Sequence, residues 1–222
     1  MLNQALQRCM FNVTMAALLV SLATIPFSAC HGQVVFDSIN LDGTFSGSQG
    51  GVAEIGSEVT LAGIARDLFQ VDFVVGAVSS PRNVQVSVYA NDGIAGAPGT
   101  LLAASPFQPA PMTGSPNPLP NSISDAFILS FPFNSITLPD TVTVTLNDDI
   151  PPGTPGTGSI AAPALTGTHV IGWSRFDGQP WVSSDFFDAP LSFRVLAVPE
   201  PSGGLIVVTL MMVAGLRRNR SI

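Results

Sequence analysis

The feature that most constrains the fold is a strict alternation of apolar and polar side chains in two short segments. In residues 83–89 (NVQVSVY) the valines Val84, Val86 and Val88 alternate with polar residues, and residues 141–146 (TVTVTL) repeat the pattern with threonines. Successive side chains of a β-strand point to opposite faces of a sheet, so this period of two predicts strands with one buried face. We expect the valines in a core and the threonines on the solvent side.

Further segments rich in β-branched and aromatic residues are separated by clusters of Gly, Pro, Asn and Asp. They are residues 34–41, 58–64, 70–78, 126–131, 168–175 and 191–198. No convincing amphipathic helix interrupts them, which predicts an all-β domain built as an antiparallel β-sandwich or jelly roll. Two proline-rich segments, 105–121 and 148–167, are expected to be surface loops of that single domain.

The N-terminal segment 1–32 has the features of a secretory signal peptide. A positive residue, Arg8, precedes an apolar stretch, and Cys30-His31-Gly32 satisfies the small-x-small pattern of a cleavage site before Gln33. We therefore expect a signal-peptide helix that is removed. An alternative stays open, because residues 28–30 (SAC) resemble the end of a lipobox, which would make the chain a lipoprotein anchored at Cys30.

The C-terminal segment 199–222 joins three different parts in a fixed order. Prolines flank one acid in Pro199-Glu200-Pro201 and favour an extended backbone there. The apolar run 203–216 follows, about 21 Å long as a helix against a hydrocarbon core of about 30 Å, so we expect a short transmembrane helix suited to a transient anchor. The basic residues that end the chain are expected to stay cytoplasmic. They are Arg217, Arg218 and Arg220.

This order of motif, apolar run and basic end resembles the PEP-CTERM sorting signal of Gram-negative bacteria. The resemblance implies export by the secretion machinery, passage through the inner membrane, recognition of Pro199-Glu200-Pro201 by an exosortase, and a final place at the cell surface or outside the cell. Residues 88–102 resemble the strand-turn-strand signature of choice-anchor domains, which are exported bacterial domains. We therefore divide the chain into a signal peptide (1–32), an exported β-sandwich domain (33–198) and a sorting signal (199–222).

Charge limits the partners of the exported domain, residues 33–198. It contains fourteen Asp and Glu and four Arg, so it carries ten net negative charges, and the chain has no lysine. A surface of this sign repels phosphate backbones, which argues against a nucleic-acid partner. Both cysteines, Cys9 and Cys30, precede the domain, so we expect no disulfide in it.

Residues able to perform nucleophilic catalysis are scarce, and we predict a non-enzymatic role. The domain has one histidine, His169, and neither cysteine nor lysine, and the chain has no G-x-S-x-G motif. Counting along the strand expected at 168–175 places His169 on the same face as Ile171 and Trp173, where a structural role is expected.

Calcium is the one cofactor that the domain could hold, and no other is expected. Two clusters of oxygen ligands lie beside turns, as hard cations require. They are Asn91 with Asp92 and Asp148 with Asp149. Neither cluster has EF-hand spacing, and Asn-Asp-Gly is also a common turn sequence.

A carbohydrate-binding surface is the alternative function from a different class. Trp181 lies in a segment expected to be a loop, between the carboxylates Asp177 and Asp185. Aromatic rings stack on sugars and carboxylates accept hydrogen bonds from hydroxyl groups, so this segment is a candidate for binding extracellular polysaccharide. Cleavage by a pair of carboxylates is a less favoured variant of the same hypothesis. Trp173, in mid-strand, is expected in the core.

Overall fold

The computed structural model describes residues 32–39, 44–46, 54–115, 126–149, 159–175, 179–184 and 191–199. The chain divides into two units, Met1–His31 and Gly32–Ile222, and every described residue belongs to the second. The predicted signal peptide up to residue 31, including Cys30, and the predicted sorting signal from Glu200 on lie outside the described residues.

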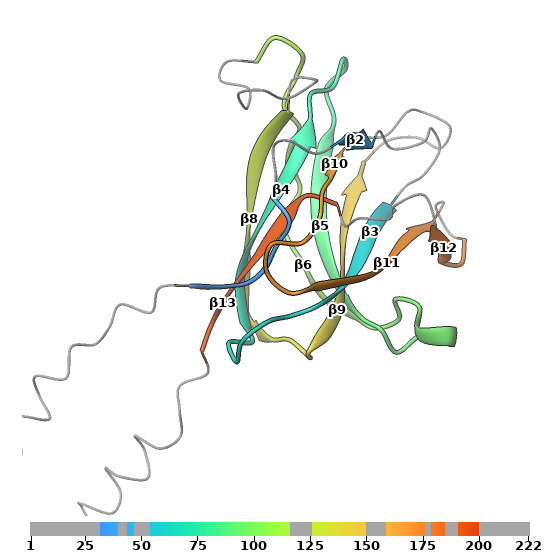
Figure 1. Cartoon of the computed structure of the whole chain (residues 1–222). Helices are drawn as coiled ribbons and strands as arrows, with labels where there is room; N and C mark the ends of the chain where they lie inside the picture. Colours follow the sequence, from blue (N-terminus) through green and yellow to red (C-terminus); the bar gives the residue numbers. More distant parts are fainter. Residues whose placement is uncertain are drawn as a thin grey trace, which may run out of the picture. The chain divides into compact units, whose positions relative to one another are not determined.

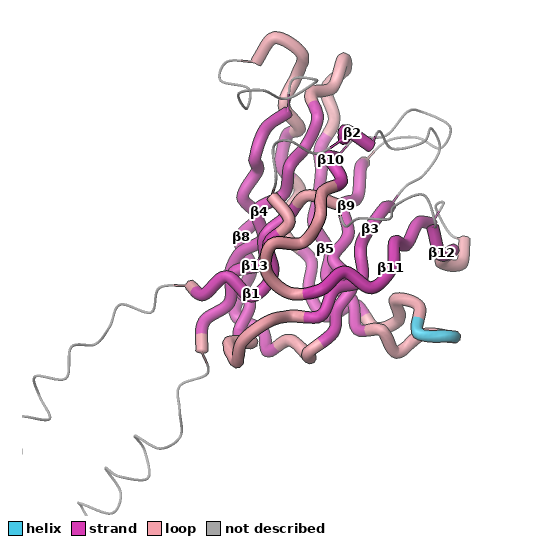
Figure 2. The backbone as a smooth tube through the Cα atoms, viewed as in Figure 1, coloured by secondary structure: helices cyan, strands magenta, loops and turns pink. Residues whose placement is uncertain are grey.

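Strands make up most of the described backbone (Figure 2). One sheet has four strands in the order β1-β13-β4-β8, and all neighbours in it are antiparallel. Its strands are β1 (Gln33–Asp37), β13 (Phe193–Val198), β4 (Asp67–Gly76) and β8 (Ala126–Thr137). Among the described residues the only helical element is the 3-10 turn η1 (Ile94–Gly96).

A second, seven-stranded sheet has the order β12-β11-β3-β9-β5-β6, with β7 also paired to β5. Its strands are β12 (Val182–Ser184), β11 (Thr168–Arg175), β3 (Glu54–Thr60), β9 (Thr141–Asp148), β5 (Asn83–Ala90), β6 (Leu101–Ala104) and β7 (Gln108–Pro109). Two short strands, β2 (Thr44–Ser46) and β10 (Ser159–Ala161), form a separate antiparallel pair.

All eight segments predicted as strands contain strands, which confirms the all-β, antiparallel prediction. Four shorter strands were not anticipated: β2, β7, β10 and β12. Strand β6 begins at Leu101, where the strand-turn-strand resemblance of residues 88–102 places a returning strand. Both proline-rich segments expected to be loops contain a short strand. Strand β7 lies in 105–121 and contributes only two residues at the edge of a sheet, where proline is tolerated. Strand β10 lies in 148–167 and pairs with β2.

The core lies between the two larger sheets (Figure 1). The four-stranded sheet contributes stacked phenylalanines, with the Phe193 ring centroid 4.8 Å from that of Phe36 and 5.4 Å from that of Phe73. The seven-stranded sheet contributes the predicted valine rows of β5 and β9, whose valines are fully buried. Because side chains of both sheets form one hydrophobic cluster, the fold is β-sandwich-like.

The first and last strands of the described unit are neighbours. Strand β1 pairs with β13 so that Gln33 lies opposite Ala197, and Asp37 opposite Arg194 (Figure 1). The backbone therefore enters and leaves the four-stranded sheet at the same end. Among the described residues no helix has the length and apolar character needed to cross a bilayer, and the predicted segment 203–216 lies outside them.

A bulge corrects the predicted placement of His169. Strand β11 pairs with β3 so that His169 lies opposite Val59, but the register shifts at the next residue and Ile171 lies opposite Glu58. Residues that are opposite in a ladder share one side of the sheet, and Val59 belongs to the core. His169 is therefore on the inner side, whereas Ile171 and Trp173 are on the outer side.

Candidate functional site

The outer face of the seven-stranded sheet carries a buried polar cluster. Ladder pairing places Arg175 of β11 opposite Glu54 of β3, and Thr145 of β9 lies opposite Ser87 of β5. We call Glu54, Tyr89, Thr145, Arg175 and Trp181 the outer cluster. Its strand residues come from four adjacent strands, so the sheet itself brings these side chains together.

Glu54 is the centre of the outer cluster and is only 2% exposed. Arg175 donates from Nε to Glu54 Oε2 at 2.8 Å, and Arg175 Nη2 forms an ion pair with the same oxygen at 2.5 Å. Thr145 donates its hydroxyl to Oε1, and Tyr89 donates to Oε2 at 3.4 Å. A buried carboxylate is stable only when paired and hydrogen-bonded, and these contacts meet that requirement.

Tyr89 is the only tyrosine of the chain and is 6% exposed. Its hydroxyl accepts a hydrogen bond from Arg175 at 3.1 Å while donating to Glu54. Burial, together with the negative charge of Glu54, raises the pKa of Tyr89 to about 12. The hydroxyl group is therefore held in its neutral form, as a donor to the carboxylate.

Trp181, the residue before β12, covers the outer cluster. The guanidinium carbon of Arg175 lies 4.5 Å from the Trp181 ring centroid and 5.7 Å from that of Tyr89. The two rings meet edge to face, with centroids 5.5 Å apart and planes at 74°. Arg175 thus combines an ion pair with Glu54 and cation–π contacts with Trp181 and Tyr89. Trp181 is half-buried in this arrangement.

The outer cluster corrects the prediction that the threonines of β9 face solvent. Thr143 and Thr145 do lie on the face opposite the valines, but both are 0% exposed. Thr143 donates its hydroxyl to Asn91 Oδ1 at 2.7 Å, and Thr145 contacts Glu54. The alternation predicted correctly which face of the sheet carries the threonines. It could not show that polar and aromatic side chains from other strands cover that face.

Trp173 is buried, as expected for a mid-strand residue, but on this outer face and not in the cluster between the two sheets. It is 8% exposed and its Nε1 donates to Glu58 at 3.2 Å. Trp173 pairs with Gly56, and a Cβ at Gly56 would lie 2.5 Å from the Thr145 methyl group. Close packing of β3 against β9 therefore requires glycine at this position.

Two acids of β3, Glu54 and Glu58, lie on this outer face. Glu54 is enclosed and ion-paired, and the nearest acid along its strand face is Glu58. Four residues of extended strand separate their backbones by about 13 Å. Of the predicted sugar-binding residues, Trp181 belongs to this site, and Asp177 and Asp185 lie outside the described residues.

The calcium candidates Asn91 and Asp92 stabilise a loop. Both carboxylate oxygens of Asp92 accept hydrogen bonds at 2.6 Å from Thr100, one from its backbone N–H and one from its hydroxyl. These bonds lower the pKa of Asp92. The side-chain oxygen of Asn91 accepts the hydrogen bond from Thr143 described above.

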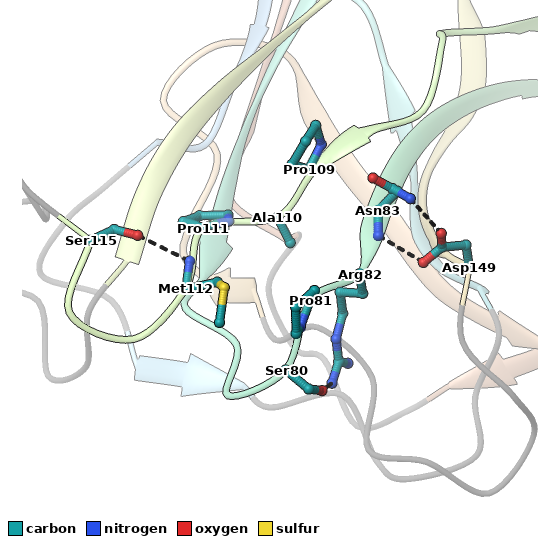
Figure 3. Close-up of a pocket in the computed structure, with 10 residues that line it drawn as sticks. All are labelled: Ser80, Pro81, Arg82, Asn83, Pro109, Ala110, Pro111, Met112, Ser115 and Asp149. Carbon is teal, nitrogen blue, oxygen red and sulfur yellow. Dashed lines mark hydrogen bonds between the residues drawn. The ribbon is translucent and has the colours of Figure 1, made fainter.

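Asp148 and Asp149 lie at the other end of the β5–β9 ladder, because Val84 is opposite Asp148 whereas Ala90 is opposite Val142. Asp149 accepts two hydrogen bonds from Asn83, from the backbone N–H at 2.7 Å and from Nδ2 at 2.6 Å (Figure 3). They lower the pKa of Asp149.

Asn83 and Asp149 line a surface pocket whose other walls carry prolines and a methionine (Figure 3). Beside the pocket Asp148 forms an ion pair with Arg82 at 3.7 Å. The structure therefore does not combine the two calcium clusters, and no group of three His, Cys, Asp or Glu gathers within the part of the chain that it describes. Calcium binding by either cluster stays a prediction.

Comparisons of the chain with protein-family models, with curated proteins and with solved structures find no match.

Proposed function

We propose that residues 33–198 form a non-enzymatic domain that is exported and delivered by the segment 199–222 to the cell surface or to extracellular polysaccharide. In this proposal the whole chain has three parts. They are a signal-peptide helix within 1–32, an antiparallel β-sandwich of jelly-roll type, and a short transmembrane helix within 203–216. The observation that carries the proposal is the order of motif, apolar run and basic end at the C-terminus. An exosortase and the inner membrane are the partners in transit.

The boundaries of the described strands support this division. Strand β1 begins at Gln33, where signal cleavage is expected, and β13 ends at Val198, directly before the exposed Pro199. Val198 is still paired in the sheet, opposite Asp67. Removal of the segments before Gln33 and after Val198 would therefore delete no described strand.

The pairing of β1 with β13 gives further support. Gln33 lies opposite Ala197, so the leader and the tail attach at one end of the four-stranded sheet. A domain with this geometry can be tethered through either end to the same membrane surface, which suits export followed by transient anchoring.

Mass spectrometry of the exported protein tests the sorting proposal. We expect a mature species without Arg217 and Arg218, and retention of both in Glu200→Gln, because the acid between the prolines is part of the recognised motif. Ser202→Ala is the neighbouring control and is expected to be processed normally. A wild-type protein that reaches its destination with the arginines still attached would refute processing.

Carbohydrate binding at the outer cluster is the second candidate function. The observation that favours it is Trp181, a half-buried ring fixed by Arg175 and Tyr89 on a sheet face. A preorganised aromatic side chain beside charged groups is suited to stacking on a sugar ring while polar groups contact hydroxyls.

Glycan-array binding by the full chain tests this second function. We expect binding to extracellular polysaccharide to be lost in Trp181→Ala and retained in Val182→Ala, whose side chain is 57% exposed next to it. Binding that survives Trp181→Ala would exclude the outer cluster as the sugar surface.

A further inference from the structure

Three loops lie at the same end of the seven-stranded sheet. Thr60 of β3 is opposite Thr141 of β9, and the next residue of β9 is opposite Ala90 of β5. Each of these strands therefore begins or ends at this end of the sheet, and so do the loops that follow or precede them. They are the loops 61–66, 91–100 and 138–140.

The first and third of these loops join the two sheets, so the four-stranded sheet reaches the same end (Figure 1). Loop 61–66 leads into Asp67 of β4, which is opposite Val198, the last residue of β13. Gln33, where signal cleavage is expected, is opposite Ala197. We call the three loops the tether end, because the leader and the tail both attach to the strands beside them.

The tether end carries the two most exposed large apolar side chains among the described residues. Ile94 is 95% exposed and Ile64 is 84% exposed, whereas the next, Leu165, is 64% exposed. Single exposed apolar side chains are normal on a folded domain, but apolar side chains that gather in one place indicate an interaction surface.

Both isoleucines lie on loops whose backbones are held by hydrogen bonds. Ala62 of the first loop donates its N–H to the carbonyl oxygen of Val35 at 2.7 Å. Arg66, at the end of the same loop, donates to Asp140 of the third loop at 2.7 Å. The second loop is closed by the hydrogen bonds of Asp92 described above. The two side chains are therefore presented to solvent on preorganised loops.

We propose that the tether end docks on the surface of the bilayer that holds the tail, with the side chains of Ile64 and Ile94 inserted at the headgroup boundary. This inference rests on the proposed function, in which the run 203–216 lies in the membrane. Four residues, 199–202, separate that run from Val198, and they span at most about 14 Å when extended. The tether end is therefore held within reach of the bilayer, where a high effective concentration makes a weak apolar contact sufficient.

Charge indicates which lipid surface the tether end fits. Its three loops contain one basic residue, Arg66, and two acids, Asp92 and Asp140. They carry one net negative charge, whereas the whole exported domain carries ten. The tether end can therefore approach a bilayer with little electrostatic cost, and headgroups without net charge suit it best.

Spin labels in the full chain, reconstituted in phosphatidylcholine vesicles, test this docking surface. All variants carry Cys9→Ser and Cys30→Ser, so that an introduced thiol is the only one. Ile64→Cys and Ile94→Cys place a nitroxide label at the tether end. Electron paramagnetic resonance then measures collisions of each label with oxygen, which concentrates in lipid, and with a nickel complex, which stays in water.

The matched control is Val182→Cys, at an aliphatic residue whose side chain is 57% exposed. Val182 is opposite Ser174, and Ser174 is opposite Ile55. Ile55 lies at the end of β3 remote from Thr60, so the control label is at the other end of the same sheet.

We expect the labels at Ile64→Cys and Ile94→Cys to collide more with oxygen, and less with nickel, than the label at Val182→Cys. Adding Ile94→Ser should lower the oxygen collisions of the label at Ile64→Cys, because both side chains contribute to one contact. Labels as open to nickel as the control, in chains that float with the vesicles, would overturn the docking surface and leave the membrane anchor standing.

Two further outcomes distinguish the alternatives. Protection of both labels from oxygen as well as from nickel would mean that a protein, such as a second copy of this chain, covers the tether end in place of lipid, and it would overturn the proposal. Chains that do not float with the vesicles would refute the membrane anchor of the proposed function and, with it, the docking surface.

Discussion

The apolar core and the outer cluster lie on opposite faces of the same strands, β3, β5 and β9, and both bury side chains. The core achieves this with stacked rings such as Phe36 and Phe193 and with rows of valines. The outer cluster achieves it by pairing each polar group, with Glu54 contacting Arg175, Thr145 and Tyr89. A core tolerates apolar replacements of similar volume, whereas a buried ion pair requires both partners. The two faces should therefore respond differently to substitution and to pH.

The largest effect of a substitution on the free energy of unfolding is expected in the core. Phe193→Ala removes a fully buried ring that contacts Phe36 and Phe73, and it should lower the free energy of unfolding by about 3–5 kcal/mol. Denaturant unfolding measures it. Phe107→Ala, at a ring 48% exposed, is the control and should change stability by roughly 0.5 kcal/mol or less. Similar losses in the two variants would mean that the stacked rings are not the centre of the core.

Breaking the outer cluster should have the next largest effect. Arg175→Met leaves Glu54 buried without its cation, and we expect a loss of about 3 kcal/mol, the low end for buried pairs because the Arg175 side chain is 34% exposed. The double variant Glu54→Gln/Arg175→Met should recover part of the loss, because it removes the unpaired charge.

The matched control for Arg175→Met is Arg66→Met. It breaks an ion pair with Asp140, whose side chain is 83% exposed, and should cost less than about 1 kcal/mol. If Arg66→Met and Arg175→Met destabilise the protein equally, the outer cluster behaves as an ordinary surface pair and the contrast between the two faces fails.

A smaller effect on stability is expected at alkaline pH, where ionisation of Tyr89 would affect the outer cluster and leave the apolar core unchanged. The absorbance of the phenolate reports Tyr89 alone, since the chain has no other tyrosine. In the folded protein we expect a pKa of about 12, and in urea the ordinary value near 10. Because folding raises this pKa, the contribution to stability is complete below pH 10 and is lost as the pH rises through the folded pKa.

Burial is the larger cause of the raised pKa of Tyr89, and substitution of Glu54 by Gln tests the additional electrostatic contribution. The negative charge of Glu54 raises the pKa of Tyr89, so Glu54→Gln should move the midpoint of the titration downward. A wild-type midpoint near the ordinary value in the folded protein would show that Tyr89 is hydrated and that the outer cluster is open to water.

The smallest effect is expected at His169, at the inner side of β11. Burial lowers the pKa of His169 by disfavouring the imidazolium form, and its Nε2 is buried without a hydrogen-bond partner among the described residues. The contribution of the neutral ring is complete above the unfolded pKa near 6.5 and is lost as the pH falls through the lower folded value. His169→Gln should remove this part of the pH dependence of the melting temperature. An NMR titration with an unshifted or raised pKa would contradict it.

Local alternation was sufficient to predict strands β5 and β9 and their buried valines, because the period of two depends only on neighbouring residues. It could not predict the outer cluster, since Glu54 and Arg175 are 121 residues apart and meet only through the pairing of β3 with β11. The prediction of the sheet face of His169 was wrong for a related reason. A bulge changes the register after His169, and no local sequence pattern marks this bulge.

The amino-acid sequence by itself determined the strand-rich class, the acidic sign of the domain and the order of parts at its C-terminus, because composition and short-range periodicity carry that information. Only the tertiary structure decided which polar residues became buried and that β1 and β13 are neighbours. Those outcomes depend on contacts between residues distant in the chain, and their geometry is set by the packing of two sheets on one core.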